Sequence, residues 1–153
     1  MAAKRKATKR LSVPRPRNGG QWTEARFTSF VKSALRGARW PAKYECIKKA
    51  FVENGINPET GKKCKLCRCE GCGKIGKQGD LKADHIEPVV GPEGFQTWDI
   101  FISRLYVEAD GFQALCKECH DKKTAEEREG RKAAEKYIDG LFIKAGIPRK
   151  EKA

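Results

Sequence analysis

Two pairs of cysteines, each with the spacing Cys-x-x-Cys, constrain this chain more than any other feature of its sequence. The first pair is Cys69 and Cys72, and the second is Cys116 and Cys119. The short spacer lets both thiolates of a pair reach one ion, and four thiolates form the closed tetrahedral site that Zn²⁺ prefers in a structural role. Because only 39% of the 153 residues are apolar and 35% are charged, the hydrophobic core should be small. We therefore expect a structural zinc ion that joins two distant parts of the chain.

A third pair, Cys64 and Cys67, leaves the choice of zinc ligands open. This pair could replace Cys69 and Cys72 at the ion, or it could belong to a strand that leads to them. Gly73 directly follows Cys72, and a small residue there suits a tight turn around the metal. This glycine favours the later pair as the ligands.

The cysteine count and the start of the chain both bear on location. Seven is an odd number, and the paired spacings are typical of metal-binding thiolates in a reducing compartment rather than of disulfides. The basic segment 1–10 is not followed by the apolar stretch of a secretion signal. No run approaches the roughly 18 apolar residues that a membrane span requires. A soluble, cytoplasmic protein with no membrane partner is expected.

The balance of charge favours a polyanionic partner. Lysine and arginine total 33 against 20 acidic residues, which gives a net charge of +13. Such an excess points first to nucleic acid. Residues 1–20 are expected to form a disordered basic arm. The arm could add salt-sensitive, sequence-independent affinity for DNA, or it could only keep the chain soluble.

Residues 21–60 are expected to form a helical extension. Thr23 can cap a first helix with one buried apolar face, and Pro41 suits the first turn of a second helix that continues to Gly55. The two helices could dock on DNA, or they could only pack against the rest of the chain.

The remainder of the sequence predicts the α+β fold class. Residues 61–130 contain the cysteine pairs in a glycine-rich region of short strands, and helical spacing returns within 94–108 and again from Cys116 onward. Residues 131–153 are expected to form a C-terminal helix and a basic tail. No internal repeat is present.

The chain contains only two histidines, and each stands beside a residue that can bind metal. His85 directly follows Asp84, and His120 directly follows Cys119. Hydrolysis of a phosphodiester needs a base that works near neutral pH and a divalent cation at the scissile phosphate, and Asp84, His85 and His120 supply that minimum. Neighbours on a strand point to opposite faces, so Asp84 and His85 can serve one site only if the backbone turns there. Alternatively, both histidines are structural.

Taken in order, these motifs resemble the zinc-containing HNH endonucleases. The similarity covers roughly residues 64–128 and lies in Cys69-x-x-Cys72, Asp84-His85-Ile86-x-Pro88 and Leu115-Cys116-x-x-Cys119-His120-x-x-Lys123-Thr124. With the addition of Asn18-Gly19-Gly20-x-Trp22-Thr23 and residues 94–111, the chain is similar to small bacteriophage HNH proteins over most of its length.

The resemblance implies a ββα-metal core, also called a His-Me finger, in which two strands and a helix hold one catalytic divalent ion beside the cysteine site. Carried over residue by residue, it implies that His85 is the general base and that Asp84 and His120 bind the ion. Mg²⁺ is the expected ion, although the same ligands accept Mn²⁺, Ni²⁺ or Zn²⁺. Lys123, one helical turn beyond His120, is a candidate phosphate contact or an ordinary solvated charge.

One position departs from the family pattern. The residue nine positions before the last histidine, normally an asparagine that orients the base, is Gly111. The departure puts catalysis in doubt, although not metal binding. Asp110 could orient His85 through its carboxylate, but an acid before a glycine is also an ordinary turn.

The function expected from this resemblance is metal-dependent hydrolysis of double-stranded DNA with little sequence specificity, leaving 5′ phosphate and 3′ hydroxyl ends. One active site per chain predicts nicks, and double-strand cleavage would need a dimer or two encounters, so a monomer or weak dimer is expected. The alternative is a catalytically silent zinc protein that binds DNA or assists phage packaging through proteins such as terminase. A phage-encoded protein would act in the host cytoplasm.

Overall fold

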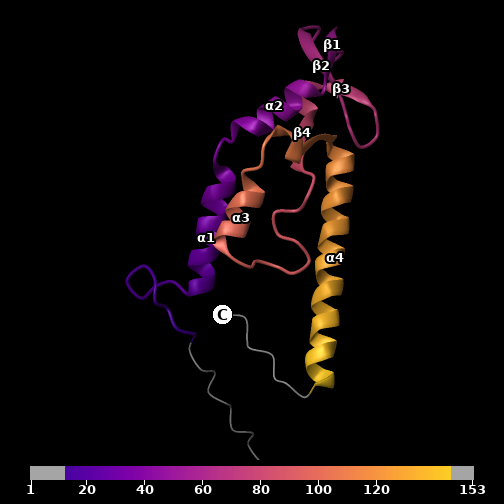
Figure 1. The fold of residues 1–153 in the computed structure, drawn as a ribbon. Coiled ribbons are helices and arrows are strands. Elements are labelled where there is room, and N and C mark those ends of the chain that lie inside the picture. Colours follow the sequence, from indigo (N-terminus) through magenta and orange to yellow (C-terminus); the bar gives the residue numbers. More distant parts are fainter. Residues whose placement is uncertain (1–12, 146–153) are drawn as a thin grey trace, which may run out of the picture. The chain divides into compact units, whose positions relative to one another are not determined.

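The computed structural model describes residues 13–145, so most of the predicted basic arm and the end of the basic tail lie outside the described residues. The chain divides into two compact units, the first ending at Ala38 and the second beginning at Arg39. Figure 1 shows the helices and strands of the described residues. Within residues 13–145 the fold is mixed α and β, with four α-helices and small antiparallel sheets. The α+β fold class predicted from the sequence is therefore confirmed.

The first unit contains helix α1 (Glu24–Gly37), preceded by a turn at residues 18–20 in which all three backbone φ angles are positive. Thr23 caps α1 as predicted, because its side-chain oxygen accepts a hydrogen bond of 3.2 Å from the Arg26 N–H. The predicted buried face is wrong, since no residue of α1 is buried and Phe30 is 56% exposed.

The second unit begins with helix α2 (Pro41–Lys49), which is shorter than predicted. The chain does not stay helical to Gly55, because strand β1 (Phe51–Ile56) follows directly. β1 pairs in antiparallel orientation with β2 (Lys63–Arg68), and β3 (Ile75–Lys77) completes a three-stranded sheet. The aromatic and β-branched residues of β1 suit a strand, and pairing with β2 outweighs the helical spacing of the sequence.

A separate two-stranded sheet precedes the last helix. It consists of β4 (Leu81–His85) and β5 (Phe112–Cys116), paired in antiparallel orientation. Helix α3 (Trp98–Leu105) lies between these strands in the sequence, inside the predicted segment, and Thr97 caps it.

Helix α4 (Lys117–Lys144) begins immediately after β5 and is one continuous helix. The sequence predicted two helices, with the second in residues 131–153. Two glycines, Gly130 and Gly140, lie inside α4 without a positive φ angle. A glycine inside a helix costs only about 1 kcal/mol relative to alanine, so a helix of 28 residues tolerates both.

The hydrophobic core of the second unit is small, as the composition predicts. It consists of Ala42, Cys46, Ile47, Ala50, Cys67, Leu81, Phe112 and Ala114, which come from α2 and the residue that follows it, and from β2, β4 and β5. Trp40 packs against this cluster, and its indole N–H donates a hydrogen bond of 2.6 Å to the Val107 carbonyl. Within the described residues, no helix combines the length and the apolar character that crossing a membrane requires.

Candidate metal centres

Four cysteine sulfurs gather where the chain leaves β2 and where α4 begins. The sulfurs of Cys69, Cys72, Cys116 and Cys119 all lie within 4.8 Å of one another, and Cys72 Sγ is 3.9 Å from Cys116 Sγ. In a tetrahedral site with Zn–S bonds of about 2.3 Å, neighbouring sulfurs lie roughly 3.8 Å apart. These four cysteines could therefore hold a structural metal ion such as zinc, and they are the two pairs favoured by the sequence.

Two glycines allow the turn between Cys69 and Cys72 to approach the start of α4. Gly73 has a φ angle of +73°, and its N–H donates to the Cys69 carbonyl at 2.8 Å. A Cβ atom on Gly71 would lie 3.1 Å from both Cβ and Sγ of Cys119. The turn therefore needs a residue that adopts the left-handed backbone conformation at position 73, and it has little room for a Cβ atom at position 71.

Hydrogen bonds join this turn to β5. The Glu70 N–H donates to the Ala114 carbonyl at 2.9 Å, and the Ala114 N–H donates to Glu70 Oε2 at 3.0 Å. This reciprocal pair places the first two cysteines beside the strand that leads to the second two, even without a metal bond.

The pKa values of the Cys69 and Cys119 thiols are shifted in opposite directions. Burial of the Cys69 thiol raises its pKa, but the backbone N–H groups of Cys116, Cys72 and Gly71 point at the sulfur and lower the pKa to about 6. Hydrogen bonds with Cys116 and Cys72 raise the pKa of the Cys119 thiol to about 12. The cluster therefore loses its first proton easily and its last with difficulty, and a metal ion that binds all four thiolates must displace the remaining protons.

The third cysteine pair lies outside this cluster. Cys64 and Cys67 are both on β2, as one of the two predicted alternatives had it. Cys67 is fully buried, its sulfur lies 3.8 Å from the Ile47 carbonyl oxygen, and burial raises its pKa. Cys67 is therefore part of the hydrophobic core.

The side chain of Asp84, on β4, faces the side chain of His120, in the first turn of α4. His120 Nε2 lies 3.7 Å from Asp84 Oδ1, and the two side chains are 27% and 19% exposed. The His120 carbonyl accepts a hydrogen bond of 2.8 Å from Thr124, which fixes this turn of the helix. One oxygen and one nitrogen at this separation could share a divalent cation with a metal–ligand distance of about 2.1 Å.

Lys123 occupies the other side of Asp84. Its ammonium lies 2.7 Å from Asp84 Oδ2 and 2.9 Å from Glu127, and it also donates to the His85 carbonyl. Burial lowers the pKa of Lys123, but hydrogen bonds to Asp84 and Glu127 outweigh that effect and raise it. Lys123 is therefore the ion-pair partner of the candidate metal ligand, and not the solvated charge that the sequence allowed.

His85 projects to the opposite face of β4 from Asp84, because the two are neighbours on the strand. Its Nε2 lies 3.0 Å from the carbonyl oxygen of Leu105, and its ring lies 4.5 Å from the ring of Phe112. β4 ends at His85, and the next N–H, that of Ile86, donates to the Gly111 carbonyl at 3.0 Å. Burial of His85 lowers its pKa, which favours the neutral imidazole.

The Leu105 carbonyl is the hydrogen-bond partner of His85, and the structure gives no such bond to Asp110. Asp110 lies in a short 3₁₀ turn, Ala109–Gly111, with its side chain exposed. Sequence reasoning missed Leu105 because any residue type supplies a backbone carbonyl.

Comparison of the chain with known proteins identifies no relative from which a function could be inferred. No protein-family model, no curated protein and no solved structure matches the chain. The residues themselves must therefore carry any functional assignment.

Proposed function

We propose that this protein is a metal-dependent DNA endonuclease of the HNH type. The observation that carries the proposal is the approach of Asp84 on β4 to His120 in the first turn of α4, with 3.7 Å between His120 Nε2 and Asp84 Oδ1, directly beside the cysteine cluster and with His85 next to Asp84 at the end of β4. A ββα-metal core has two antiparallel strands and then a helix; here β4 pairs with β5, α3 lies between them in the sequence, and α4 follows β5 at once.

Asp84 and His120 are the residues that would hold the catalytic cation. Carboxylate oxygen and imidazole nitrogen suit Mg²⁺, Mn²⁺, Ni²⁺ or Zn²⁺, and two protein ligands leave positions for water and phosphate. When bound, such an ion stabilises negative charge on the scissile phosphate and on the departing 3′ oxygen.

His85 is the residue that would act as the general base. Its imidazole lies on the other face of β4 from Asp84, so it would serve water at the Asp84–His120 pair around the end of β4, where the strand stops at His85 and the backbone bends. When Nε2 carries the proton that is shared with the Leu105 carbonyl, Nδ1 keeps its lone pair and can accept a proton from water. The water oxygen forms the new bond to phosphorus while the bond from phosphorus to the 3′ oxygen breaks. The 3′ oxygen takes up a proton from solvent water, which leaves a 5′ phosphate and a 3′ hydroxyl. The packing of Phe112 against the imidazole helps to hold it in place.

Lys123 supports the same site through Asp84 and Glu127. Its ammonium neutralises the Asp84 carboxylate in the absence of a cation, and both charges lie on partly buried side chains. If Asp84 held a cation, the Lys123 ammonium would lose part of this interaction and could contact a phosphate instead.

The test is relaxation of supercoiled plasmid by the zinc-loaded protein with Mg²⁺ or Mn²⁺, beside a reaction without added cation. We expect His85→Ala to lower the rate by about 10² to 10⁴, the range for loss of a general base. Asp110→Ala is the matched control, and it should leave the rate unchanged because the Asp110 side chain is exposed and does not contact His85. Zinc content and thermal unfolding of each variant establish that the fold persists.

A catalytically silent zinc protein is the second candidate function, and the Asp84–Lys123 ion pair is the observation that favours it. In such a protein this ion pair is purely structural. Zinc-loaded protein that binds plasmid, leaves it supercoiled and takes up no Mn²⁺ in a titration would contradict the nuclease and support a catalytically silent zinc protein.

A further inference from the structure

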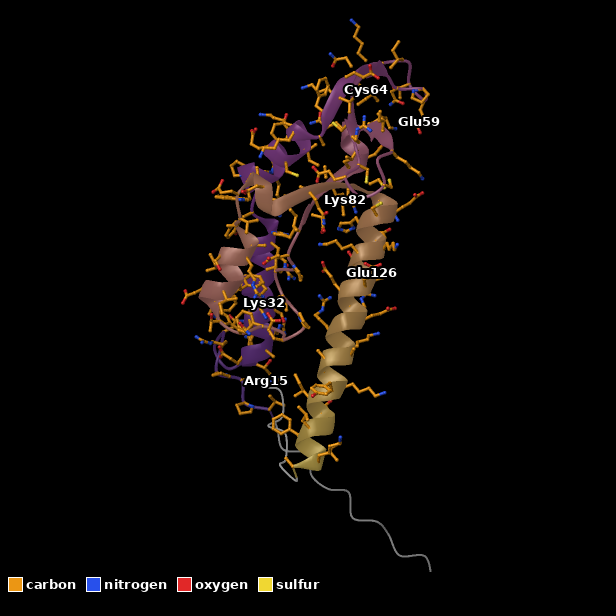
Figure 2. All side chains as sticks on the ribbon, turned by 45° about the vertical axis from the view of Figure 1, so that its right-hand side comes forward. Arg15, Lys32, Glu59, Cys64, Lys82 and Glu126 are labelled. Carbon is orange, nitrogen blue, oxygen red and sulfur yellow. The ribbon has the colours of Figure 1, made fainter. Side chains whose placement is uncertain are left out.

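We propose that the β1–β2 hairpin is a second DNA-contacting element, which enters the major groove of a duplex away from the candidate catalytic residues. This inference takes its substrate, double-stranded DNA, from the proposed function. It assigns a role to residues that the catalytic site does not use. The hairpin is the end of the second unit at which β1 and β2 are labelled in Figure 1, and Glu59 and Cys64 mark it in Figure 2.

The strand register collects a particular set of side chains on one face of the hairpin. Asn54 pairs with Lys65 and Ile56 pairs with Lys63, so each pair shares a face. A bulge between Phe51 and Glu53 shifts the alternation, and Phe51 pairs with Cys67 on this same face. We call this set the lysine face; its exposed members are Phe51, Asn54, Ile56, Lys63 and Lys65.

Acidic residues of the hairpin are kept off the lysine face. Glu53 pairs with Leu66, on the opposite face, and Glu59 is bound by Lys77 at 2.9 Å. Among residues 13–145, no ion pair engages Lys63 or Lys65. The face therefore presents two unneutralised ammonium groups, an amide and an aromatic ring, and this combination fits phosphates and base edges better than it fits an acidic or apolar protein surface.

The lysine face continues onto neighbouring elements. A hollow of ≈ 290 Å³ is lined by Phe51, Asn54 and Lys65 together with Lys48 of α2 and Gln78. Lys48 adds a third amine to the edge of the face, although Glu45 binds it at 2.8 Å.

The hairpin has the size and the preorganisation that a groove-binding ribbon needs. Each strand has six residues, which span roughly 20 Å at about 3.3 Å per residue, and the major groove of B-DNA, about 12 Å wide, admits a two-stranded ribbon. The turn is fixed by hydrogen bonds of 2.8 Å from the Asn57 N–H to Lys62 O and from the Gly61 N–H to Asn57 O. Little ordering of the hairpin backbone is therefore required on binding.

The experiment measures binding of the full zinc-loaded chain to a fluorescent mixed-sequence duplex at several salt concentrations, without added divalent cation. The test variant is Lys63→Gln/Lys65→Gln, and the matched control is Lys132→Gln/Lys136→Gln on the exposed surface of α4. Each double variant removes two positive charges. If Lys63 and Lys65 contact phosphates, the test variant binds more weakly and its slope of log affinity against log salt falls by about two, whereas the control keeps the wild-type slope.

Other outcomes overturn the proposal. If the two double variants have equal duplex affinities and equal salt slopes, the lysine face does not contact DNA. If the protein binds one strand of the duplex, added alone, more tightly than it binds the duplex, a groove-binding ribbon is excluded. Absence of duplex binding by the wild type would also overturn it. Plasmid cleavage by the same preparations is measured separately. If the wild type cleaves plasmid and Lys63→Gln/Lys65→Gln binds duplex as the wild type does, the hairpin proposal is wrong and the proposed nuclease function stands. If the double substitution weakens duplex binding but the wild type does not cleave plasmid, the nuclease function is wrong and the hairpin proposal stands.

Discussion

Position 111 is glycine, where the proposed HNH function would expect an asparagine beside the base, and the backbone carbonyl of Leu105 contacts His85. The Leu105 oxygen lies 3.0 Å from His85 Nε2. Gly111 itself keeps a backbone role, since its carbonyl accepts the Ile86 N–H at 3.0 Å, directly after β4 ends. The orientation of His85 therefore depends on where α3 ends and not on the residue type at 111.

Introducing asparagine at position 111 should destabilise the protein. A Cβ atom at Gly111 would lie 2.6 Å from Val107 Cγ2 and 2.7 Å from Val107 Cβ, and a β-carbon cannot move aside by a side-chain rotation. We expect Gly111→Asn to lower the free energy of unfolding by about 1–3 kcal/mol, the usual cost of overpacking. Denaturant unfolding of zinc-loaded protein measures the difference.

The matched control for this substitution is Gly79→Ala. Gly79 has no atom within 4 Å of a built Cβ and no positive φ, so alanine there should change stability by less than about 1 kcal/mol. If the Gly111→Asn protein has the same free energy of unfolding as the Gly79→Ala protein, Val107 and its loop can move to accommodate the new side chain without loss of stability.

At the scale of the elements, the cysteine cluster joins the turn after β2 to the first turn of α4. The same helical turn carries His120, which directly follows Cys119. A metal at the four sulfurs would therefore fix the register of His120 against Asp84, and the two candidate centres are coupled through only a few residues of backbone.

Substitution of single cysteines separates the ligands from the strand pair. Cys72→Ser should lose bound zinc and unfold at a lower temperature, because three thiolates leave a coordination position of the ion unfilled. Cys64→Ser should keep one zinc per chain, because Cys64 lies on β2 outside the cluster. Elemental analysis with parallel thermal unfolding measures both effects.

The opposite pattern, with zinc lost from Cys64→Ser and kept by Cys72→Ser, would assign the ion to the earlier cysteine pair. In either case zinc affinity should fall as the pH is lowered, since protons compete for the thiolates.

The sequence predicted those elements whose signals are local. The Thr23 cap, the start of α2 at Pro41 and the choice of cysteine pairs all depend on residues close together in the chain. The end of α2, the continuity of α4 and the exposure of α1 depend instead on contacts far apart in sequence. Phe51 fits the helical spacing of α2 as well as it fits a strand, and only pairing with β2 decides between them. The contact between His85 and Leu105 could not be predicted, because a backbone carbonyl has no sequence signature.

At the scale of the whole molecule, most of the net positive charge belongs to the first unit, and the hydrophobic core cluster belongs to the second. Residues 1–38 contain ten basic residues and one acidic residue, and so carry nine of the thirteen net positive charges. Every residue of the hydrophobic core cluster and all four clustered cysteines belong instead to the second unit. Folding of the second unit and long-range attraction of DNA should therefore be separable.

Removing residues 1–38 tests this separation. We expect the shortened chain to keep one zinc per chain and to unfold within a few degrees of the full chain, because it retains the core cluster and the Trp40 hydrogen bond to Val107. Its affinity for duplex DNA should fall, and the salt dependence should become shallower by about 0.9 for each phosphate contact that is lost. Duplex binding across a salt series, with elemental analysis and thermal unfolding on the same preparations, measures all three quantities. An unchanged salt slope would mean that these residues only keep the chain soluble, and loss of zinc or of cooperative unfolding would mean that the first unit is part of the folded core.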